Sequence, residues 1–514
     1  MSAGLEQKKA RFPRTFWVAN TMEIFERMAW YGFFAVSSLY ITNPRSEGAL
    51  GFTSEQRGTL QGAVTFILYL LPVLSGALAD RYGYKRMLAI AFSILTPAYL
   101  LLGQFHSYAG FFFAFLLVAV GAAVFKPVIV GTVARTTDEH TGTLGFGIFY
   151  MMVNIGGFVG PIVAGIVRGW AWKWVFVMSS LWIATNFIWL FLFYREPTVE
   201  AESAQKRTLR QVMNDMVEVL GTPRLFLTVL VVFVLLIAAT NEWISWTTTL
   251  LVSLVWVALN AIYDVYLRRR PSSGTSWFTT PIRLGNWRFV LFLLILSGFW
   301  TSFNQIFFTM PEYIRDFVDT QDLLLSLQHW AAAVGMSGLA AKLGALVQSG
   351  YQVNPEYIIN IDAGAIIVFQ VLVSYVMQRF PAFTTMVIGT VLAGLGVTLA
   401  AWAGTGWLVV LAIVVFSFGE MAASPKSQEY IGRVAPPDKV ALFMGYYFVT
   451  VALGNLFGGI LSGIGYQKLA LDMHRPDIMW ILFGSIGFLT AAALLLYNRY
   501  VVPGWRQEVA AERT

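Results

Sequence analysis

Three ionisable residues lie close together within a long apolar stretch near the N-terminus. Glu23, Glu26 and Arg27 are followed by Trp30 and Tyr31, and spacings of three, four, seven and eight residues put all five on one face of a helix. A charged side chain at the centre of a membrane helix costs roughly 2.5–3.5 kcal/mol on insertion scales. These residues therefore need partners or a watery cavity, which is typical of a pathway for ions or polar solutes.

Three further ionisable residues lie within apolar stretches far along the chain. Lys126 supplies a fourth charge that brings the first group to neutrality, whereas Asp362 and Glu420 are two acids with no base securely inside the same half. Structural pairing alone could explain Glu23 with Arg27, but it explains the two later acids poorly. We expect Asp362 and Glu420 to lie close together and to share a proton in one conformation, because neighbouring carboxylates in an apolar site do not both ionise readily.

The elements that position these residues are predicted to be membrane-spanning helices. The chain of 514 residues is 57% hydrophobic and 12% charged, against about 45–50% and about 25% in ordinary soluble proteins. A helix of about 20 apolar residues crosses a bilayer. Fourteen such spans are predicted: 15–41, 55–79, 87–105, 108–134, 143–168, 173–194, 225–243, 246–267, 288–310, 357–378, 383–403, 405–425, 440–465 and 477–500.

The distribution of basic residues predicts the orientation of these spans. Most of the 35 Lys and Arg residues lie in the segments that are cytoplasmic if the N-terminus is inside, as the positive-inside rule requires. The even number of spans places the C-terminus inside as well. The net charge of +7 therefore reflects basic cytoplasmic loops, and no nucleic-acid partner is expected.

The composition also argues against several kinds of catalytic site. The chain has no cysteine and only four histidines, so a Cys-based zinc or iron–sulfur site is excluded and a histidine metal cluster is not expected. It has no H-E-x-x-H pair, G-x-S-x-G elbow or G-x-x-x-x-G-K-[ST] loop. We expect no cofactor and no enzyme activity, and keep a polytopic membrane enzyme as a remote alternative.

Polar segments divide the chain into predicted domains. Residues 1–195 form a first bundle of six spans, and residues 196–286 form a cytoplasmic linker that contains two extra spans. Residues 287–505 form a second six-span bundle, in which 320–350 is an external amphipathic segment or lid. Residues 506–514 are a cytoplasmic tail.

An internal repeat relates the two bundles. Residues 121–127 align with 419–425 at an offset of 298 residues. The same offset, without gaps, pairs Arg135 with Arg433, Gly147 with Gly445, Gly156 with Gly454, Gly160 with Gly458, and Gly165 with Gly463. Two six-span halves in the same orientation are the repeat pattern of the major facilitator fold, in which the substrate site lies near the bilayer midplane. The predicted fold class is therefore an all-α membrane protein with two six-helix bundles and two inserted helices.

Several motifs resemble those of the proton-coupled oligopeptide transporter family, fourteen-helix bacterial type, within the major facilitator superfamily. The resemblance covers nearly the whole chain. Its motifs are Glu23-x-x-Glu26-Arg27, residues 76–86 (GALADRYGYKR), Phe125-Lys126-Pro127, residues 146–156 (FGIFYMMVNIG), and Gly419-Glu420 with Ser424-Pro425.

The resemblance implies a role for each matching residue. Arg27, Lys126 and Asn154 would receive the carboxylate of a peptide, and Glu420 would hold its ammonium group. The other residues expected at the substrate are Trp30, Tyr31, Tyr69, Tyr150, Trp300, Asn304, Asp362 and Tyr447, although ordinary helix packing is an equal alternative for the aromatic ones. The expected proton-coupling residues are Glu23, Glu26, Arg27, Lys126, Asp362 and Glu420, and the expected gating residues are Asp80 and Arg81.

The sequence departs from the family pattern at three positions. Asn304 stands where the family usually has a glutamate, Asp362 replaces the Asn of an Asn-Pro pair, and Tyr447 replaces a tryptophan. On one interpretation, the acid that the family has in span seven, where this chain has Asn304, is provided in this chain by Asp362 in span eight. The implied function is proton-driven import of di- and tripeptides or peptide-like compounds. The alternative is a relative that carries another zwitterion, an organic anion or a drug, with altered coupling.

The expected setting follows from the same resemblance. We expect a monomer in the bacterial cytoplasmic (inner) membrane, surrounded by the lipid bilayer. Its other partners would be a small-molecule substrate and protons, with the proton gradient as the energy source in place of any cofactor.

Overall fold

The computed structural model describes most of the chain as helices. The described residues are 12–137, 141–197, 222–240, 243–268, 287–434 and 440–503. Among them the β-structure is limited to one isolated bridge between Asp319 and Thr405. The all-α prediction is therefore confirmed. Just under half of the predicted linker (198–221, 241–242 and 269–286) and the whole of the predicted tail (506–514) lie outside the described residues.

Eleven helices of the described chain are long and apolar enough to cross a bilayer. They cover Tyr84–Leu102, Tyr108–Arg135, Leu144–Arg168, Lys173–Phe193, Trp246–Leu267, Arg288–Phe308, Pro355–Met377, Ala382–Trp402, Gly406–Ile431, Tyr447–Asp472 and Pro476–Tyr500.

The remaining three predicted spans fall on shorter or more polar helices. They correspond to α1 (Arg14–Thr42), which carries the charged motif, to α2 (Ser54–Leu70) with α3 (Pro72–Tyr82), and to α9 (Pro223–Thr240). The second predicted span is interrupted at Leu71, where Pro72 begins a new helix because proline lacks the N–H that would continue the old one. The total of fourteen spans stays a prediction.

The described chain divides into two compact units. Unit 1 lies within Met1–Val36 and Leu71–Thr208, and unit 2 lies within Ser37–Leu70 and Leu209–Thr514. The end of α1 and all of α2 thus group with the C-terminal half. The predicted domain boundaries are not tested by this division, because it follows contacts rather than the repeat.

Unit 1 is a bundle of helices around an aromatic core. Its helices are α1 up to Val36, α3, α4 (Tyr84–Leu102), α5 (Tyr108–Arg135), α6 (Gly142–Arg168) and α7 (Lys173–Ile188), which ends in a π-helical turn, η2 (Trp189–Phe193). Phe33 of α1 is fully buried and packs edge-on against Phe115 of α5, 5.2 Å between ring centroids. This packing holds the charged stretch of α1 against α5, the helix that carries Lys126.

Unit 2 contains the remaining helices. In chain order they are η1 (Arg45–Glu47), α2, α9, α10 (Trp246–Arg268), α11 (Trp287–Phe303), α12 (Gln305–Phe308), α13 (Met310–Phe317), α14 (Gln321–Ala333), α15 (Ser337–Gln348), α16 (Pro355–Ile359), α17 (Ile361–Met377), α18 (Ala382–Leu399), η3 (Ala400–Trp402), α19 (Gly406–Val434), α20 (Val440–Gly465), η4 (Tyr466–Asp472) and α21 (Pro476–Tyr500). Helix α18 packs along α19 and α21, and α2 packs along α20.

The repeat predicted from sequence has a structural counterpart in each unit. In unit 1 a Cβ on Gly156 of α6 would lie 2.6 Å from the Cβ of Arg27 on α1. In unit 2 a Cβ on the equivalent Gly454 of α20 would lie 2.2 Å from the Cβ of Trp300 on α11. Glycine is needed at both positions because any side chain would push the helices apart. The same glycine therefore sets the same helix–helix contact in both halves.

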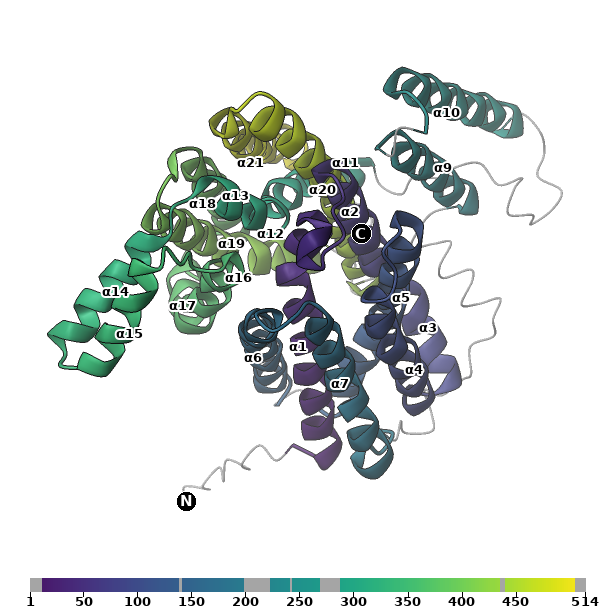
Figure 1. Cartoon of the computed structure of the whole chain (residues 1–514). Coiled ribbons are helices and arrows are strands. Elements are labelled where there is room, and N and C mark those ends of the chain that lie inside the picture. The colour runs from purple at the N-terminus through teal and green to yellow at the C-terminus, as the bar shows by residue number, and fades with distance from the viewer. Residues whose placement is uncertain are drawn as a thin grey trace. The chain divides into compact units, whose positions relative to one another are not determined.

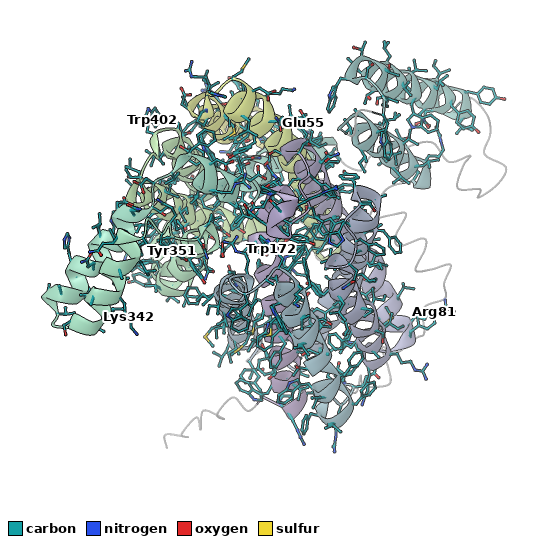
Figure 2. All side chains as sticks on the ribbon, in the orientation of Figure 1. Glu55, Arg81, Trp172, Lys342, Tyr351 and Trp402 are labelled. Atoms are coloured by element: carbon teal, nitrogen blue, oxygen red, sulfur yellow. The ribbon has the colours of Figure 1, made fainter. Side chains whose placement is uncertain are left out.

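The segment predicted as external and amphipathic forms a helical hairpin. Helices α14 and α15 lie side by side and extend away from α16–α19 within unit 2 (Figure 1). Figure 2 places Tyr351 where the hairpin joins the unit and Lys342 farther out along it. Both helices expose large apolar side chains, including Trp330 and Val334, and neither is long enough to span a bilayer.

Candidate functional site

The charges of α1 form a closed ion-pair cluster inside unit 1. Arg27 is 3% exposed and is paired with Glu23, at 3.4 Å from Nε to Oε1, and with the neighbouring Glu26. The two glutamates are also buried, and Glu23 Oε2 and Glu26 Oε1 have no hydrogen-bond partner among the described residues. The three side chains therefore cluster on one face of α1, as the sequence predicted.

Lys126 joins this cluster from α5. It interacts electrostatically with Arg27, Glu23 and Glu26. Lys126 immediately precedes Pro127, which removes one backbone hydrogen bond from the helix at this level. Two acids and two bases thus share one buried region, and their formal charges cancel.

The other residues predicted near this cluster differ in their surroundings. Tyr31 lies under the Arg27 guanidinium, 5.6 Å from ring centroid to Cζ. Trp30 is 5% exposed and stacks on Phe34, so it can pack without a ligand and its substrate role stays a prediction. Asn154 of α6 donates a 2.8 Å hydrogen bond to the backbone oxygen of Tyr150, whose side chain is 49% exposed.

The two acids of unit 2 are in contact. Asp362, in the first turn of α17, is 5% exposed and accepts a 2.6 Å hydrogen bond from Ser417 of α19. Glu420, three residues further along α19, is hydrogen-bonded to Asp362 through its side chain. Its Oε2 atom is buried and has no hydrogen-bond partner among the described residues. The structure therefore brings together two carboxyl groups that are far apart in sequence.

The substrate-lining residues predicted in unit 2 lie in a mainly aromatic environment. Trp300 of α11 packs edge-on against Tyr447 of α20, with ring centroids 6.3 Å apart. Asn304 sits at the break between α11 and α12 and donates to the backbone oxygen of Trp300, 2.7 Å away. Tyr69 is partly buried against the same apolar core. All four can pack without a ligand, so their roles stay predictions.

The predicted gating residues lie at the end of α3. Asp80 belongs to this helix, but its side chain lies outside the described part. The Cζ atom of Arg81 lies over the Tyr82 ring, 5.3 Å from its centroid, and the Arg81 Nη1 atom is buried without a hydrogen-bond partner among the described residues.

Sequence reasoning missed a second buried ion pair, which lies in unit 2. Arg57 of α2 and Glu312 of α13 are both 0% exposed, with 2.7 Å between Nε and Oε1. Ser54 donates to the same carboxylate, and Arg57 Nη1 donates to Ser462 of α20 at 2.6 Å. The available signal was a lone arginine in the apolar stretch 55–79, but nothing in the sequence identified its partner 255 residues away.

The described charged groups are suited to binding polar solutes. Among the described residues there is no cluster of three or more His, Asp or Glu side chains that could hold a metal ion. The cluster of unit 1 offers a guanidinium and an ammonium, which bind carboxylates. In the acid pair of unit 2, Glu420 Oε2 has no hydrogen-bond partner among the described residues. A carboxylate oxygen of this kind can accept a hydrogen bond from an ammonium group.

Comparison with known proteins shows which family and which proteins the chain is similar to. A family model described as Major Facilitator Superfamily matches residues 22–251 and 357–513. The chain is 23% identical to the peptide transporter YePEPT of Yersinia enterocolitica subsp. palearctica, over 92% of this chain and 91% of the relative. It is 22% identical to dipeptide and tripeptide permease A of Erwinia pyrifoliae, over 93% of this chain and 90% of the relative. These relatives are transporters and not enzymes.

A solved structure has a similar fold. It is a POT family transporter in complex with 5-aminolevulinic acid, with a TM-score of 0.69 and 20% sequence identity. The alignment covers 94% of this chain and 96% of that chain. Together with the relatives, it confirms the resemblance to oligopeptide transporters that the motifs predicted.

Proposed function

The chain belongs to the major facilitator superfamily, and on that premise we propose that it imports di- and tripeptides or peptide-like zwitterions together with protons. The observation that carries the proposal is the buried four-charge cluster of unit 1. Burying four charges within membrane-spanning helices is energetically costly, so their presence points to a functional role. The names of the relatives favour peptides as the substrate class.

The charge balance of the cluster accounts for coupling. With Glu23 and Glu26 both ionised, their charges cancel those of Arg27 and Lys126, and no net positive charge remains for a substrate. One proton on either glutamate leaves a net charge of +1 and releases donors of Arg27. A substrate carboxylate then restores neutrality, so the proton and the carboxylate favour each other's binding.

The acid pair of unit 2 has the opposite sign, which suits the ammonium group of a peptide. Glu420 would accept hydrogen bonds from the substrate ammonium through Oε2. We place the protein as a monomer in the bacterial cytoplasmic membrane, where a proton gradient drives import.

Uptake into proteoliposomes tests the proposal. Radiolabelled dialanine should accumulate when a proton gradient, acidic outside, is imposed, and a proton uncoupler should abolish the accumulation. Lys126→Ala should abolish net uptake because the remaining cluster is one positive charge short. Competition by a panel of peptides then defines the specificity.

The matched control for this test is Lys173→Ala, which removes an exposed lysine at the start of α7. This variant should take up dialanine like the unmodified protein. Full uptake by Lys126→Ala would contradict the assigned site, and the absence of any uptake by the unmodified protein would contradict the peptide assignment.

A second candidate substrate is a small zwitterion that is not a peptide. Two observations favour it: the similar solved structure holds 5-aminolevulinic acid, and Asn304, Asp362 and Tyr447 depart from the family pattern in unit 2. Competition between dialanine and 5-aminolevulinic acid for the same uptake distinguishes the two. A much stronger effect of 5-aminolevulinic acid than of any peptide would favour this candidate.

A further inference from the structure

A buried serine links the two acids of unit 2. Ser417 of α19 is 0% exposed and lies one helical turn before Glu420. Its hydroxyl oxygen is 2.6 Å from Asp362 Oδ1 and 2.8 Å from the backbone oxygen of Ile413. A hydroxyl group has one hydrogen and two lone pairs, so it donates to one of these acceptors at a time.

We propose that Asp362 and Glu420 hold one exchangeable proton that is transported with the substrate, and that the Ser417 hydroxyl serves both protonation states of Asp362. This inference rests on the proposed function, and it adds a proton site in unit 2 to the one in unit 1. It also names a positioning residue, Ser417, that the motifs do not assign.

The contact between the acids requires the proton. Two carboxyl groups that are hydrogen-bonded to each other need a hydrogen on one of them, since two carboxylates are acceptors only. Neither acid forms an ion pair with a described Lys or Arg that would offset a second negative charge. Tyr447 of α20 interacts with Glu420, and α16, which also packs against α17, carries the buried Glu356. Neither neighbour supplies a positive charge.

Ser417 allows this proton to leave and return while the backbone conformation stays the same, because only its hydroxyl group rotates. When Asp362 is ionised, the hydroxyl donates to Oδ1. When Oδ1 carries the proton, its O–H donates to Ser417 Oγ, and the hydroxyl turns to donate to the backbone oxygen of Ile413. In both states Asp362 Oδ1 and the Ser417 hydroxyl stay hydrogen-bonded at the observed distances, which avoids the cost of a buried polar group without a partner. The direct contact between the acids is made in the first state, when the proton lies on Glu420 and its O–H donates to the ionised Asp362.

Coupling follows from hydration. With one proton the pair carries a charge of −1, which one substrate ammonium at Glu420 Oε2 neutralises. When the site opens to water, hydration stabilises both carboxylates, the O–H bond of Asp362 breaks, and the proton passes to water. Closing the site removes that water, so a proton must bind again before closure.

The variant Asp362→Asn tests whether this proton is transported. Its amide can still donate a hydrogen bond to Glu420, but it cannot release a proton. Exchange of substrate across the membrane without a gradient, measured in the same variant, is the reference for its gradient-driven accumulation. Accumulation driven by a gradient of about one pH unit should fall about tenfold, because each coupled proton contributes that factor. Unchanged accumulation would overturn the proposal.

Infrared spectroscopy provides a readout without substrate. The C=O stretching band of a protonated carboxyl should be present in the unmodified protein and lost in Asp362→Asn. Its absence from the unmodified protein would overturn the proton site even if peptides are transported. If the band is present and dialanine is not transported, the proposed substrate fails while the proton site stands.

Ser417 is tested by the pH profile of uptake. In Ser417→Ala an ionised Asp362 loses a donor, so the profile of driven uptake should move to higher pH, and Ser417→Thr should restore it. Ser302→Ala, which removes a buried hydroxyl bonded to the backbone of α21, is the matched control and should leave the profile unchanged. An unchanged profile in Ser417→Ala would overturn the role of the serine.

Discussion

Arg57 and Glu312 show how much a single pair of residues can determine in a membrane protein. Both are fully buried, and the carboxylate receives hydrogen bonds from Arg57 and Ser54 while Arg57 also reaches Ser462. The pair joins α2, α13 and α20. These helices cannot separate without exposing or separating two charges, so we interpret the pair as a latch.

Removing one partner of this latch should be far more harmful than removing both. Arg57→Met leaves the Glu312 charge buried and uncompensated, which typically costs about 3–5 kcal/mol. Thermal unfolding in detergent should show a clearly lower midpoint for Arg57→Met, and the double variant Arg57→Met/Glu312→Leu should recover most of the loss. Equal midpoints for the single and double variants would contradict this account of the pair.

The residues that sequence reasoning found and missed differ in how far their partners lie along the chain. Glu23, Glu26 and Arg27 are within one helical turn, so their clustering follows from helix geometry alone. The pairing of Arg57 with Glu312 depends on the packing of helices more than 250 residues apart, which no local pattern encodes. Asp362 and Glu420 were predicted to be close because both are unpaired acids within one half, but Ser417 between them was not.

At the scale of the element, the hairpin of α14 and α15 is held by its base. Asp322 accepts hydrogen bonds from the backbone N–H groups of Gly406 and Trp407, each at 3.0 Å. It thereby caps the first turn of α19 from a distant part of the chain, at the helix end that favours negative charge. The hairpin is therefore anchored to a membrane-spanning helix although its outer part is exposed.

A second acid, Asp319, joins the two chain segments at the base of the hairpin. The backbone N–H of Gln321 and the side chain of Gln352 both donate to Asp319, and these donors hold the pKa of Asp319 below its usual value. A lowered pKa in the folded state means that the contribution to stability is present at neutral pH and is lost as the pH falls through that pKa. The base of the hairpin should thus loosen only in strongly acidic solution.

Substituting Asp322 tests the anchoring role. Asp322→Ala removes both acceptors for the first turn of α19, and loss of a helix cap typically costs about 0.5–2 kcal/mol. The thermal unfolding midpoint should fall, and it should fall less in Asp322→Asn, which keeps one acceptor. Gln348→Ala, at the exposed end of α15, serves as control. A midpoint for Asp322→Ala that matches this control would contradict the anchoring role.

Most elements could be predicted from apolar length, and the exceptions have physical causes. Predicted spans such as 108–134 and 477–500 match α5 and α21 closely, because a long apolar stretch in a membrane has few alternatives to a helix. The break at Leu71 was missed although Pro72 follows it, because the surrounding residues are as apolar as the rest of the span and membrane helices such as α5 and α6 continue through a proline. The hairpin was recognised as amphipathic, but its turn at Val334–Met336 carries no proline to mark it.

At the scale of the whole molecule, alternating access requires some helix contacts to form and break. The contact between α2 and α20 is a candidate because glycines from both helices let their backbones touch. A Cβ on Gly58 would lie 2.2 Å from the backbone oxygen of Gly459 and 2.6 Å from the backbone nitrogen of Gly463. The latch of Arg57 and Glu312 lies at the same contact. This close packing therefore defines one conformational state of unit 2.

Gly58→Ala should shift the protein away from that state, since the added methyl group is compatible only with a wider separation of α2 and α20. The natural absence of cysteine allows a single reporter, Leu456→Cys, on the buried surface of α20. Its reaction with a maleimide should be slow in the Leu456→Cys protein and faster after Gly58→Ala. Gly338→Ala, where an added Cβ meets nothing within 4 Å, should leave the rate unchanged. If Gly58→Ala also leaves it unchanged, α2 and α20 do not separate, and the contact is a fixed part of the scaffold rather than one that opens during transport.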